Sequence, residues 1–447
     1  MDECHCVNFP GEGVDIKTPR NEYLSAFFKR SYANHTVKVR MPIIITKIID
    51  SLVRNKEEIT TIHGLESAED LKHVIGELSK LKYEIQTNKE IVKLKSTEPD
   101  AVHYNKVLKY HNDQNATCSY FNVLWLFAEC YMYRRIKEMF EETVHLQKFD
   151  PFREDKRSTF FKGKEAMIYL GQFLLDILSS HFRNDESDFK ELLKINMWGN
   201  KCDLSHTNGD ALAPTLSLIE CNKSLSKNLL CDMSNEVWLA ANVESRYQFI
   251  DVVLDNCGYE LFTDLCIADF LCTKNIAERV RFYVKTIPWF LSDVMKKDLE
   301  WLVDQCADSE DDVLRNLGSR WKTYLEDDFW TIEEHDFWTT PLEYKHMFKV
   351  DESLYRKLAR AKLIIFKGDL NYRKLFGERS WDPTTSIEHA LGGFFPSRIC
   401  SLRTLKSESI CGLNDNAVKK AENEDSTWMI SGNYGVIQYC GNNMVLI

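Results

Sequence analysis

A short polar stretch in the middle of the chain, Asp255-Asn256-Cys257-Gly258-Tyr259-Glu260, contains residue types that can bind a cation. It directly follows the apolar run 249–254, which has the composition of a buried strand. Open α/β sheets bind ligands at the carboxyl ends of their strands, so two carboxylates and an amide at this position indicate a site. Asp, Asn and Gly are also common in turns and helix caps, and this cluster alone leaves that alternative open.

Three further polar clusters follow strand-like runs in the second half of the chain. Because the carboxyl ends of parallel strands meet at one edge of a sheet, we expect all four clusters to form one rim. The three are Lys367-Gly368-Asp369-Leu370-Asn371-Tyr372-Arg373-Lys374 after the run 363–366, Ser292-Asp293 after the run 281–285, and Arg403-Thr404-Leu405-Lys406 after the run 399–402.

The side chains of this rim suit a hard divalent cation that faces a phosphate group. Asp255, Asn256 and Asp293 would supply oxygen ligands, which favour Mg²⁺ or Mn²⁺ over ions that prefer thiolates. Permanent cations can clasp a phosphate, and a divalent metal with clustered cations is the usual requirement of phosphoryl transfer. The cations expected in this role are Lys367, Arg373, Arg403 and Lys406. A surface salt-bridge cluster at the sheet edge is the structural alternative.

Two carboxylates of the rim could handle protons. Glu260 lies four residues after Asn256, so the two side chains would share a face if a helix begins at the Asp-Asn turn. Asp369 could act as a base or accept a hydrogen bond from a substrate hydroxyl. The sequence does not rank Glu260 and Asp369 against each other.

Motifs of competing chemistries do not occur in the sequence. There is no Gly-x-x-x-x-Gly-Lys-Ser/Thr loop, no Cys followed by five residues and Arg, and no Gly-x-Ser-x-Gly. A glycine-rich dinucleotide turn after a strand is absent as well. These absences disfavour P-loop hydrolysis, cysteinyl-phosphate chemistry and serine hydrolysis.

Size and charge restrict the classes of partner. The chain has 447 residues, an apolar content of 44% and a formal charge of −11, which disfavours a broad nucleic-acid-binding surface. The 14 cysteines are scattered, no signal-peptide core precedes residue 19, and no uninterrupted apolar run reaches the length of a membrane span. We therefore expect free thiols, no membrane contact, and a cytoplasmic or nuclear location.

The periodicity of apolar residues divides the chain into two parts. From residue 18 to about 195 the pattern is helical, and after residue 197 short apolar runs alternate with helical stretches, as in a parallel or mixed sheet with crossover helices. We expect a mainly helical N-terminal lobe over 1–196 and an α/β domain over 197–447 that binds metal and phosphate. The acidic and aromatic segment 326–341 resembles a surface excursion or lid.

Together these motifs closely resemble the metal-dependent damage-control phosphatase family. The Arg-Thr-x-Lys element at 403–406 is similar to that of the family's third subfamily, and the match extends from about residue 18 to the C-terminus. Further matching stretches are Glu129-Cys130-Tyr131-Met132-Tyr133-Arg134-Arg135 and 198–205. We interpret Glu129, Arg134 and Arg135 as buried ion pairs within the helical lobe.

The resemblance implies a fold, an activity and roles for individual residues. The fold would be a helical lobe packed on a Rossmann-like α/β/α sandwich domain, and the substrates would be small phosphometabolites such as fructose 1-phosphate and fructose 6-phosphate. Asp255, Asn256 and Asp293 would hold Mn²⁺, or alternatively Ni²⁺, Co²⁺ or Mg²⁺. The residues implied in substrate contact are Asp255, Asn256, Asp369, Leu370, Asn371, Tyr372, Arg373, Arg403 and Lys406.

Two alternatives of other classes stay open. The third subfamily also implies a methyltransferase that uses S-adenosylmethionine to modify protein glutamates, with Glu260 and Asp293 as the cofactor contacts. No glycine-rich turn follows a first strand to approach such a cofactor, so this alternative ranks second. A metabolite sensor whose helical lobe binds a protein partner is the non-catalytic alternative.

Overall fold

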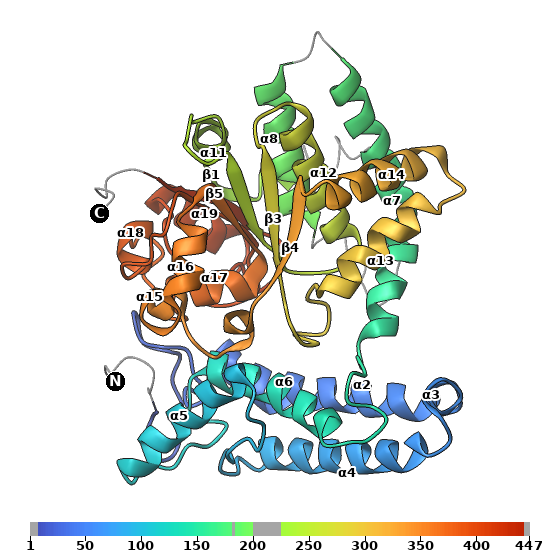
Figure 1. The fold of residues 1–447 in the computed structure, drawn as a ribbon. Helices are drawn as coiled ribbons and strands as arrows, with labels where there is room; N and C mark the ends of the chain where they lie inside the picture. Colours follow the sequence, from blue (N-terminus) through green and yellow to red (C-terminus); the bar gives the residue numbers. More distant parts are fainter. Residues whose placement is uncertain (1–7, 181–183, 200–224, 442–447) are drawn as a thin grey trace.

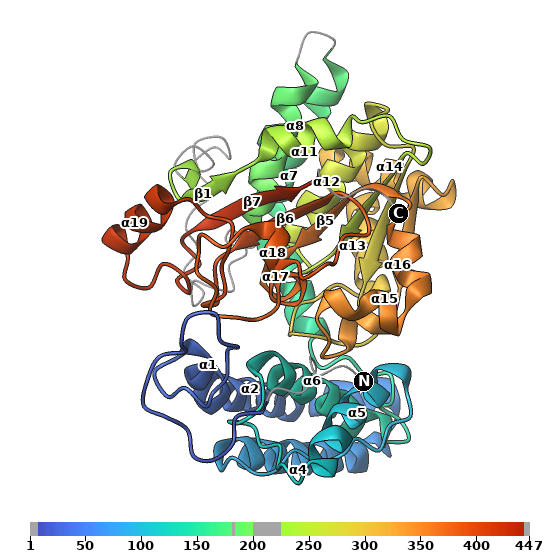
Figure 2. The ribbon, with the colours of Figure 1, turned by 90° about the vertical axis from the view of Figure 1, so that its left-hand side faces the viewer.

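A layer of helices lies beneath one edge of a mixed β-sheet (Figure 1). The chain is described by a computed structural model, which covers residues 8–180, 184–199 and 225–441. Figure 2 shows the same two-layer arrangement from the side, with the N-terminal helices below the sheet. The helical layer consists of α1 (Tyr32–His35), η2 (Thr36–Arg40), α2 (Met41–Arg54), α3 (Lys56–His63), α4 (Ser67–Gln86), α5 (Pro99–Asp113) and α6 (Trp125–Glu141).

Helices of this layer form where apolar residues recur at steps of three and four. In α2 the buried side chains include Met41, Ile45, Ile48 and Leu52, which make one stripe that faces the other helices. Most of α6 is buried. The core of the layer also contains Trp289 and Leu370 from the second half of the chain, so the two parts are packed together.

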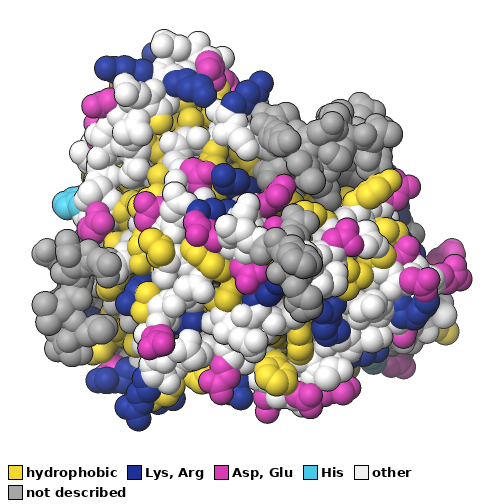
Figure 3. All heavy atoms as spheres, turned by 90° about the horizontal axis from the view of Figure 1, so that it is seen from above, with side chains coloured by type: hydrophobic (Ala, Val, Ile, Leu, Met, Phe, Trp, Pro, Cys, Tyr) yellow, Lys and Arg dark blue, Asp and Glu magenta, His cyan; other side chains and the backbone are white. Residues whose placement is uncertain are grey.

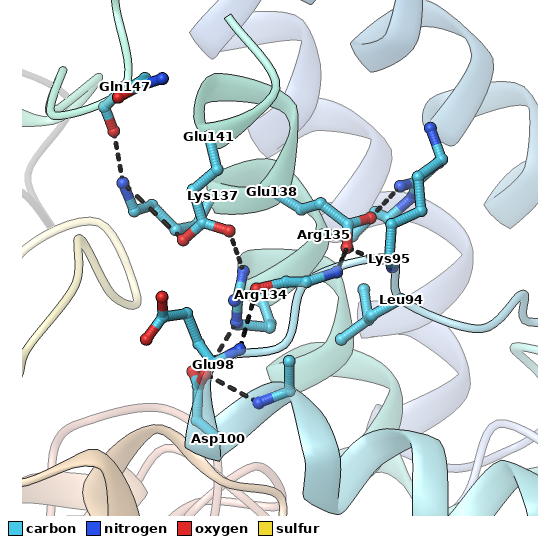
Figure 4. Close-up of polar contacts among 12 residues, drawn as sticks. Leu94, Lys95, Glu98, Asp100, Arg134, Arg135, Lys137, Glu138, Glu141 and Gln147 are labelled. Carbon is cyan, nitrogen blue, oxygen red and sulfur yellow. Dashed lines mark hydrogen bonds and ion pairs between the residues drawn. The ribbon is translucent and has the colours of Figure 1, made fainter.

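Buried ion pairs hold α6 against the chain around α5 (Figure 4). Arg134 Nε donates to Asp100 Oδ1 at 3.0 Å, and its Nη1 donates to Glu141 Oε2 at 3.1 Å. Arg135 pairs with Glu138, whose Oε1 accepts the backbone N–H of Lys95 at 2.6 Å. The interpretation of Arg134 and Arg135 as structural ion pairs of the helical part is confirmed.

The described residues of the second part form a seven-stranded sheet with the order β1-β7-β6-β5-β2-β3-β4. Strands β6, β5, β2, β3 and β4 run parallel, whereas β7 is antiparallel to β6 and parallel to β1. The sheet is therefore mixed, as expected. The strands are β1 (Leu229–Asp232), β2 (Phe249–Val253), β3 (Arg279–Val284), β4 (Trp330–Glu334), β5 (Ala361–Lys367), β6 (Ile399–Thr404) and β7 (Gly435–Cys440).

Helices cover both faces of the sheet. On one face, Ile250, Val252 and Phe282 pack with α7 (Arg153–Ser179), α8 (Asp185–Met197), α11 (Ser234–Ala241), α12 (Tyr259–Thr273), α13 (Lys296–Ala307) and α14 (Asp312–Glu326). On the other face, Val253, Ile364 and Phe366 pack with η4 (Asp336–Thr339), η5 (Tyr344–His346), α15 (Met347–Val350), α16 (Glu352–Leu358), α17 (Gly368–Phe376), α18 (Ile387–Ala390) and α19 (Asp415–Glu424). The fold class expected from the sequence, a helical layer on an α/β/α sandwich, is confirmed.

The long helix α7 leads from the helical layer up along the sheet (Figure 1). Met167, Leu170 and Leu174 of α7 and Leu193 of α8 belong to the hydrophobic core of one sheet face. By packing, both helices therefore support the sheet. The division of the chain into 1–196 and 197–447 stays a prediction, and residues 200–205 of a matching stretch lie outside the described residues.

The segment 326–341 is not a lid over the surface. It supplies the edge strand β4 and the short helix η4, and Trp330 and Trp338 are each only 1% exposed. Tyr104 of α5 donates a hydrogen bond to the Thr339 carbonyl at 2.7 Å, which ties this segment to the helical layer. The acidic residues suggested a surface segment, but the buried tryptophans determine its packing.

The far side of the molecule, opposite the helical layer, carries a mixed surface (Figure 3). Lys and Arg side chains alternate there with Asp and Glu, so neither sign of charge forms a large patch on the described part of this face. Of the helices in the described ranges, none combines the length and the apolar composition needed to cross a membrane.

Candidate functional site

Four neighbouring strands bring the four polar clusters to one edge of the sheet. Strands β6, β5, β2 and β3 lie side by side and parallel, so their carboxyl ends share the edge that faces the helical layer. From β2 the chain moves outward to β3, whereas from β5 it moves in the opposite direction to β6. The crevice between the ends of β2 and β5 is thus a topological switch point, where open α/β sheets bind ligands.

The loop after β2 is organised by the Asn256 side chain. Asn256 Nδ2 donates to Asp255 Oδ2 at 2.7 Å and to Glu260 Oε2 at 2.8 Å. Its Oδ1 accepts a hydrogen bond from Ser292 Oγ at 2.5 Å. Helix α12 begins only at Tyr259, so Asn256 meets Glu260 from the loop and not from a shared helical face. The expected proximity of Asn256 and Glu260 is therefore present, but its geometric reason differs.

Asp293 is held beside Asp255 although the two lie on different loops. The backbone N–H of Val294 donates to the Asp255 carbonyl at 2.8 Å, and Asn256 and Asp293 form an isolated bridge. Lys285 Nζ pairs with Asp293 Oδ2 at 3.3 Å and donates to the Leu254 carbonyl at 3.2 Å. The set predicted to bind metal, Asp255, Asn256 and Asp293, thus converges.

The carboxylates of this cluster are buried and repel one another. Burial, and then the negative charges of Asp293 and Glu260, raise the pKa of Asp255 well above its ordinary value. Burial raises the pKa of Asp293 to about 6, although Lys285 favours its ionised form. A divalent cation among these oxygens would relieve the repulsion, although Lys285 already pairs with Asp293 Oδ2.

The donor set fits a hard ion that keeps part of its hydration. Within 8–180, 184–199 and 225–441, no three His, Cys, Asp or Glu side chains are grouped so that they could hold a metal by themselves. A metal here would accordingly need the amide oxygen of Asn256 beside Asp255 and Asp293, with the remaining positions left to water or substrate. Mg²⁺ and Mn²⁺ accept such open oxygen sites.

Lys367, at the end of β5, is paired with two buried carboxylates. Its Nζ is 2.9 Å from Asp264 Oδ1 and 3.4 Å from Glu260 Oε1. Burial alone would lower the pKa of Lys367, but Asp264 and Glu260 outweigh it and raise the pKa. Asn196 Nδ2 donates to Asp264 Oδ1 at 2.6 Å and completes this support. Lys367 therefore pairs with Glu260 and Asp264, whereas the sequence predicted that it would bind a phosphate.

Asp369 and Arg403 form a fixed pair at the ends of β5 and β6. Arg403 Nε donates to Asp369 Oδ1 at 2.8 Å, and the guanidinium carbon lies 4.1 Å from the centre of the Tyr372 ring. The other guanidinium nitrogens donate to Ser407 and to the Ser409 carbonyl. Burial opposes ionisation of Asp369, but the charges of Arg403, Arg373 and Lys406 together outweigh it and hold the pKa of Asp369 below its ordinary value. Arg403 is thus placed to position Asp369.

Arg373 connects the sheet to the helical layer. Its Nη1 donates to Glu129 Oε2 of α6 at 2.8 Å, its Nε pairs with Glu378, and its guanidinium carbon lies 4.0 Å from the centre of the Trp125 ring. Nη2 is buried and has no hydrogen-bond partner among the described residues. The interpretation of Glu129 as an ion pair within the helical part is wrong, because its partner comes from α17.

The other predicted substrate contacts differ in which of their groups could reach a ligand. The Leu370 side chain packs in the core of the helical layer, so only its backbone N–H, in the first turn of α17, is available to a ligand. The amide of Asn371 donates to the Leu254 and Lys367 carbonyls, and the Tyr372 hydroxyl accepts the Cys411 N–H. These side chains fix the ends of β2 and β5. Lys406 is half-buried, and its charge favours ionisation of both Asp255 and Asp369.

Comparisons with known proteins identify the family of this chain. The model of the family described as "Damage-control phosphatase ARMT1-like domain" matches residues 36–421. The chain is 38% identical to damage-control phosphatase ARMT1 of Danio rerio over 430 residues, which is 93% of this chain and 96% of that protein. It is also 38% identical to the Homo sapiens protein of the same name, over 92% of this chain and 96% of that protein. The chain belongs to the ARMT1-like damage-control phosphatase family.

Membership of the ARMT1-like family confirms the resemblance that the motifs indicated, and it confirms a phosphatase as the enzyme class. Damage-control phosphatases are typically metal-dependent, which agrees with the oxygen cluster at the end of β2. The roles of individual residues stay predictions, for which the geometry above gives the physical basis.

Four supporting residues of this ARMT1-like site were not predicted. Asp264 lies four residues after Glu260 on α12, and this helical spacing could have indicated it. Lys285 is the last residue of the run 281–285, where a charged side chain at a strand end is a usable signal. Asn196 and Glu378 carry no such signal, because neither directly follows a strand-like apolar run.

Proposed function

We propose that this chain hydrolyses small phosphometabolites with the help of a divalent cation, and that hexose phosphates such as fructose 1-phosphate and fructose 6-phosphate are its substrates. The observation that carries the proposal is the crevice between β2 and β5. An oxygen cluster of Asp255, Asn256 and Asp293 lies on one side of this crevice, and the first turn of α17 with Lys406 belongs to the other. Opposed charges of this kind suit a metal-bridged phosphate.

The cation would be held by Asp255, Asn256 and Asp293, and Mn²⁺ is the first candidate, with Ni²⁺, Co²⁺ and Mg²⁺ as alternatives. When bound, it would polarise the phosphoryl oxygens and neutralise their charge. Lys285 fixes Asp293, whereas the Asn256 amide is held with its nitrogen toward Asp255 and Glu260 and its oxygen toward Ser292, so this amide would have to turn to offer its oxygen to the cation.

The phosphate would lie at the start of α17. The backbone N–H groups of Gly368, Asp369 and Leu370 lie in the first turn of α17, where no intrahelical acceptor is available, so they point out of the helix start toward an anion. Lys406 would add a positive charge, and the buried Nη2 of Arg373, which has no hydrogen-bond partner among the described residues, would add a donor to the phosphate. Together these groups would stabilise the charge on the phosphoryl oxygens as water attacks phosphorus and the sugar oxygen leaves with a proton.

Asp369 would act mainly on the sugar. Because Arg403 keeps its pKa low, Asp369 stays ionised near neutral pH and can accept a hydrogen bond from a sugar hydroxyl. Glu260 and Asp369 both remain candidates for orienting the attacking water. This arrangement favours small substrates with hydroxyl groups close to the phosphate.

The methyltransferase alternative has less support. Its two expected cofactor contacts, Glu260 and Asp293, are held by Lys367 and Lys285 within the carboxylate cluster. No observation in the described residues favours S-adenosylmethionine over a cation at these oxygens.

Phosphate release from fructose 1-phosphate tests the proposal. We expect release with Mn²⁺, loss of release after chelation, and a reduction of at least about a hundredfold in Asp255→Asn. Asp232→Asn is the matched control, because Asp232 also ends a strand but belongs to β1, which runs in the opposite direction and ends at the other edge. This control should keep the full rate.

Two results would contradict the proposal. Equal rates of phosphate release in Asp255→Asn and in Asp232→Asn would contradict the role of Asp255 as a metal ligand. Methyl transfer from S-adenosylmethionine to protein carboxylates, without phosphate release from any sugar phosphate, would favour the alternative.

A further inference from the structure

A second cavity lies at the C-terminal end of α17, away from the helix start that carries Asp369. Its volume is about 410 Å³, which is enough for a small metabolite. Phe376 and Gly377, at the end of the helix, form part of the wall. The other lining residues used below are Asn21, Lys345, Arg379, Trp381 and His389.

Arg379 is held in this cavity by aromatic rings and not by a carboxylate. Its guanidinium carbon lies 3.7 Å from the centre of the Tyr23 ring and 5.6 Å from that of the Trp381 ring. Nη1 donates to the Asn21 carbonyl at 2.9 Å, whereas Nε and Nη2 make no hydrogen bond to the described residues. Stacking fixes the plane of an arginine and leaves its N–H edge ready for an oxyanion.

The charges around the cavity favour an anion. The lining residues include two permanent cations, Lys345 and Arg379, and no carboxylate. Lys345 pairs with Glu343, whose carboxylate lies against the lining residue Gly377, which leaves Arg379 as the main positive charge. The nearby Asp382 pairs with Arg20, whose Nε lies 3.9 Å from Asp382 Oδ2. His389 is exposed and lies edge-on to Trp381.

From this geometry we infer that the cavity is an accessory binding site for the phosphate group of a small metabolite. Nε and Nη2 of Arg379 would form a two-pronged contact to phosphate oxygens, with Lys345 as a second point charge. The Trp381 ring would form the apolar wall beside the rest of the ligand. This inference stands on the cavity alone and does not depend on the proposed sugar phosphatase activity.

The cavity lies on the seam between the N-terminal segment and the chain after α17. The Leu24 N–H donates to the Glu378 carbonyl at 3.0 Å, and the Asn21 N–H donates to the Ser380 carbonyl at 2.7 Å. A ligand that bridges Arg379 and Asn21 would hold this seam closed. Ligand binding at the cavity would therefore raise the thermal stability of the protein.

Titration of the full chain with inorganic phosphate in a calorimeter tests the inference. We expect two classes of phosphate site: one weakened about tenfold or more in Arg379→Met, and one weakened in Lys406→Met at the candidate active site. Arg356→Met is the matched control, because Arg356 is an exposed arginine whose partner is Glu352, and it should keep both classes.

Further measurements keep the result independent of folding and of catalysis. Trp381→Phe should keep the site while abolishing any phosphate-dependent change in Trp381 fluorescence, and Arg379→Met should keep the basal phosphatase rate. Unchanged phosphate binding in Arg379→Met, or loss of all phosphate binding in Lys406→Met, would overturn the accessory site. Succinate that binds at the cavity as tightly as phosphate would overturn its assignment to phosphate.

Discussion

Gly368 leaves the space that the Asp255 carboxylate occupies. A β-carbon built on Gly368 would lie 1.9 Å from Asp255 Oδ2, and the Gly368 backbone has a φ of +82°. The end of β5 and the end of β2 can approach this closely only because the residue between them has no side chain. The crevice at the switch point depends on this one contact.

Gly368→Ala should therefore displace Asp255 and reduce phosphate release by at least about a hundredfold, with a loss of thermal stability as well. Gly64→Ala is the matched control. Gly64 has a φ of +93° with no atom within 4 Å of a built β-carbon, so this change carries only the cost of the backbone conformation, about 1–3 kcal/mol. If the two variants had equal rates, the contact with Asp255 would not matter for the site.

Arg373 should be required for the junction between the helical layer and the sheet. Arg373→Met leaves Glu129 and Glu378 buried without their shared cation, and breaking such a pair costs about 3–5 kcal/mol of unfolding free energy. Denaturant unfolding measures the loss. The exposed pair of Arg54 and Asp50 gives the control, because Arg54→Met should cost less than about 1 kcal/mol. A similar small cost in Arg373→Met would show that the junction does not depend on this ion pair.

Lys374 should make stability depend on pH. Its ammonium donates to the Trp338 and Thr340 carbonyls in a fully buried position, and burial lowers its pKa to about 7. As the pH falls from about 10 to 7, the unfolded chain binds the proton before the folded chain does, so Lys374 lowers stability over this window. The slope from this group is at most about 1.4 kcal/mol per pH unit.

Lys374→Met removes this titration, so the difference in unfolding free energy between Lys374→Met and the wild type should change steadily between pH 10 and 7 and stay constant below pH 7. Unfolding in denaturant at several pH values measures it. Parallel curves for both proteins across this window would show that Lys374 keeps an ordinary pKa in the folded chain.

Arg403 should set the acid side of the activity profile. Without the Arg403 guanidinium the pKa of Asp369 rises, so Asp369 becomes protonated at a higher pH than in the wild type. In Arg403→Met, kcat/KM for fructose 1-phosphate should fall, and its acid limb should move to higher pH. Asp369→Asn is the reference, because it should lack that limb at any pH. An acid limb in Arg403→Met that coincides with that of the wild type would exclude Asp369 as the titrating group.

The sequence by itself determined the elements and the kinds of side chain at their ends. The helical pattern from residue 18 to about 195 was predicted, and α2, α4 and α6 lie within it, because apolar spacing is a local property of the chain. The run 249–254 was predicted as a strand, and Asp255, Asn256 and Asp293 were recognised as oxygen donors by residue type. Periodicity and donor chemistry are local properties of the sequence.

Only the tertiary structure decided which charges meet. Arg373 pairs with Glu129 across 244 residues, and Lys367 faces Asp264 and Glu260 in place of open solvent. The acidic segment 326–341 became the sheet edge because burial of Trp330 and Trp338 stabilises it, while its carboxylates stay at least partly exposed to water. Pairings between distant residues depend on strand order and helix packing, which local patterns do not encode.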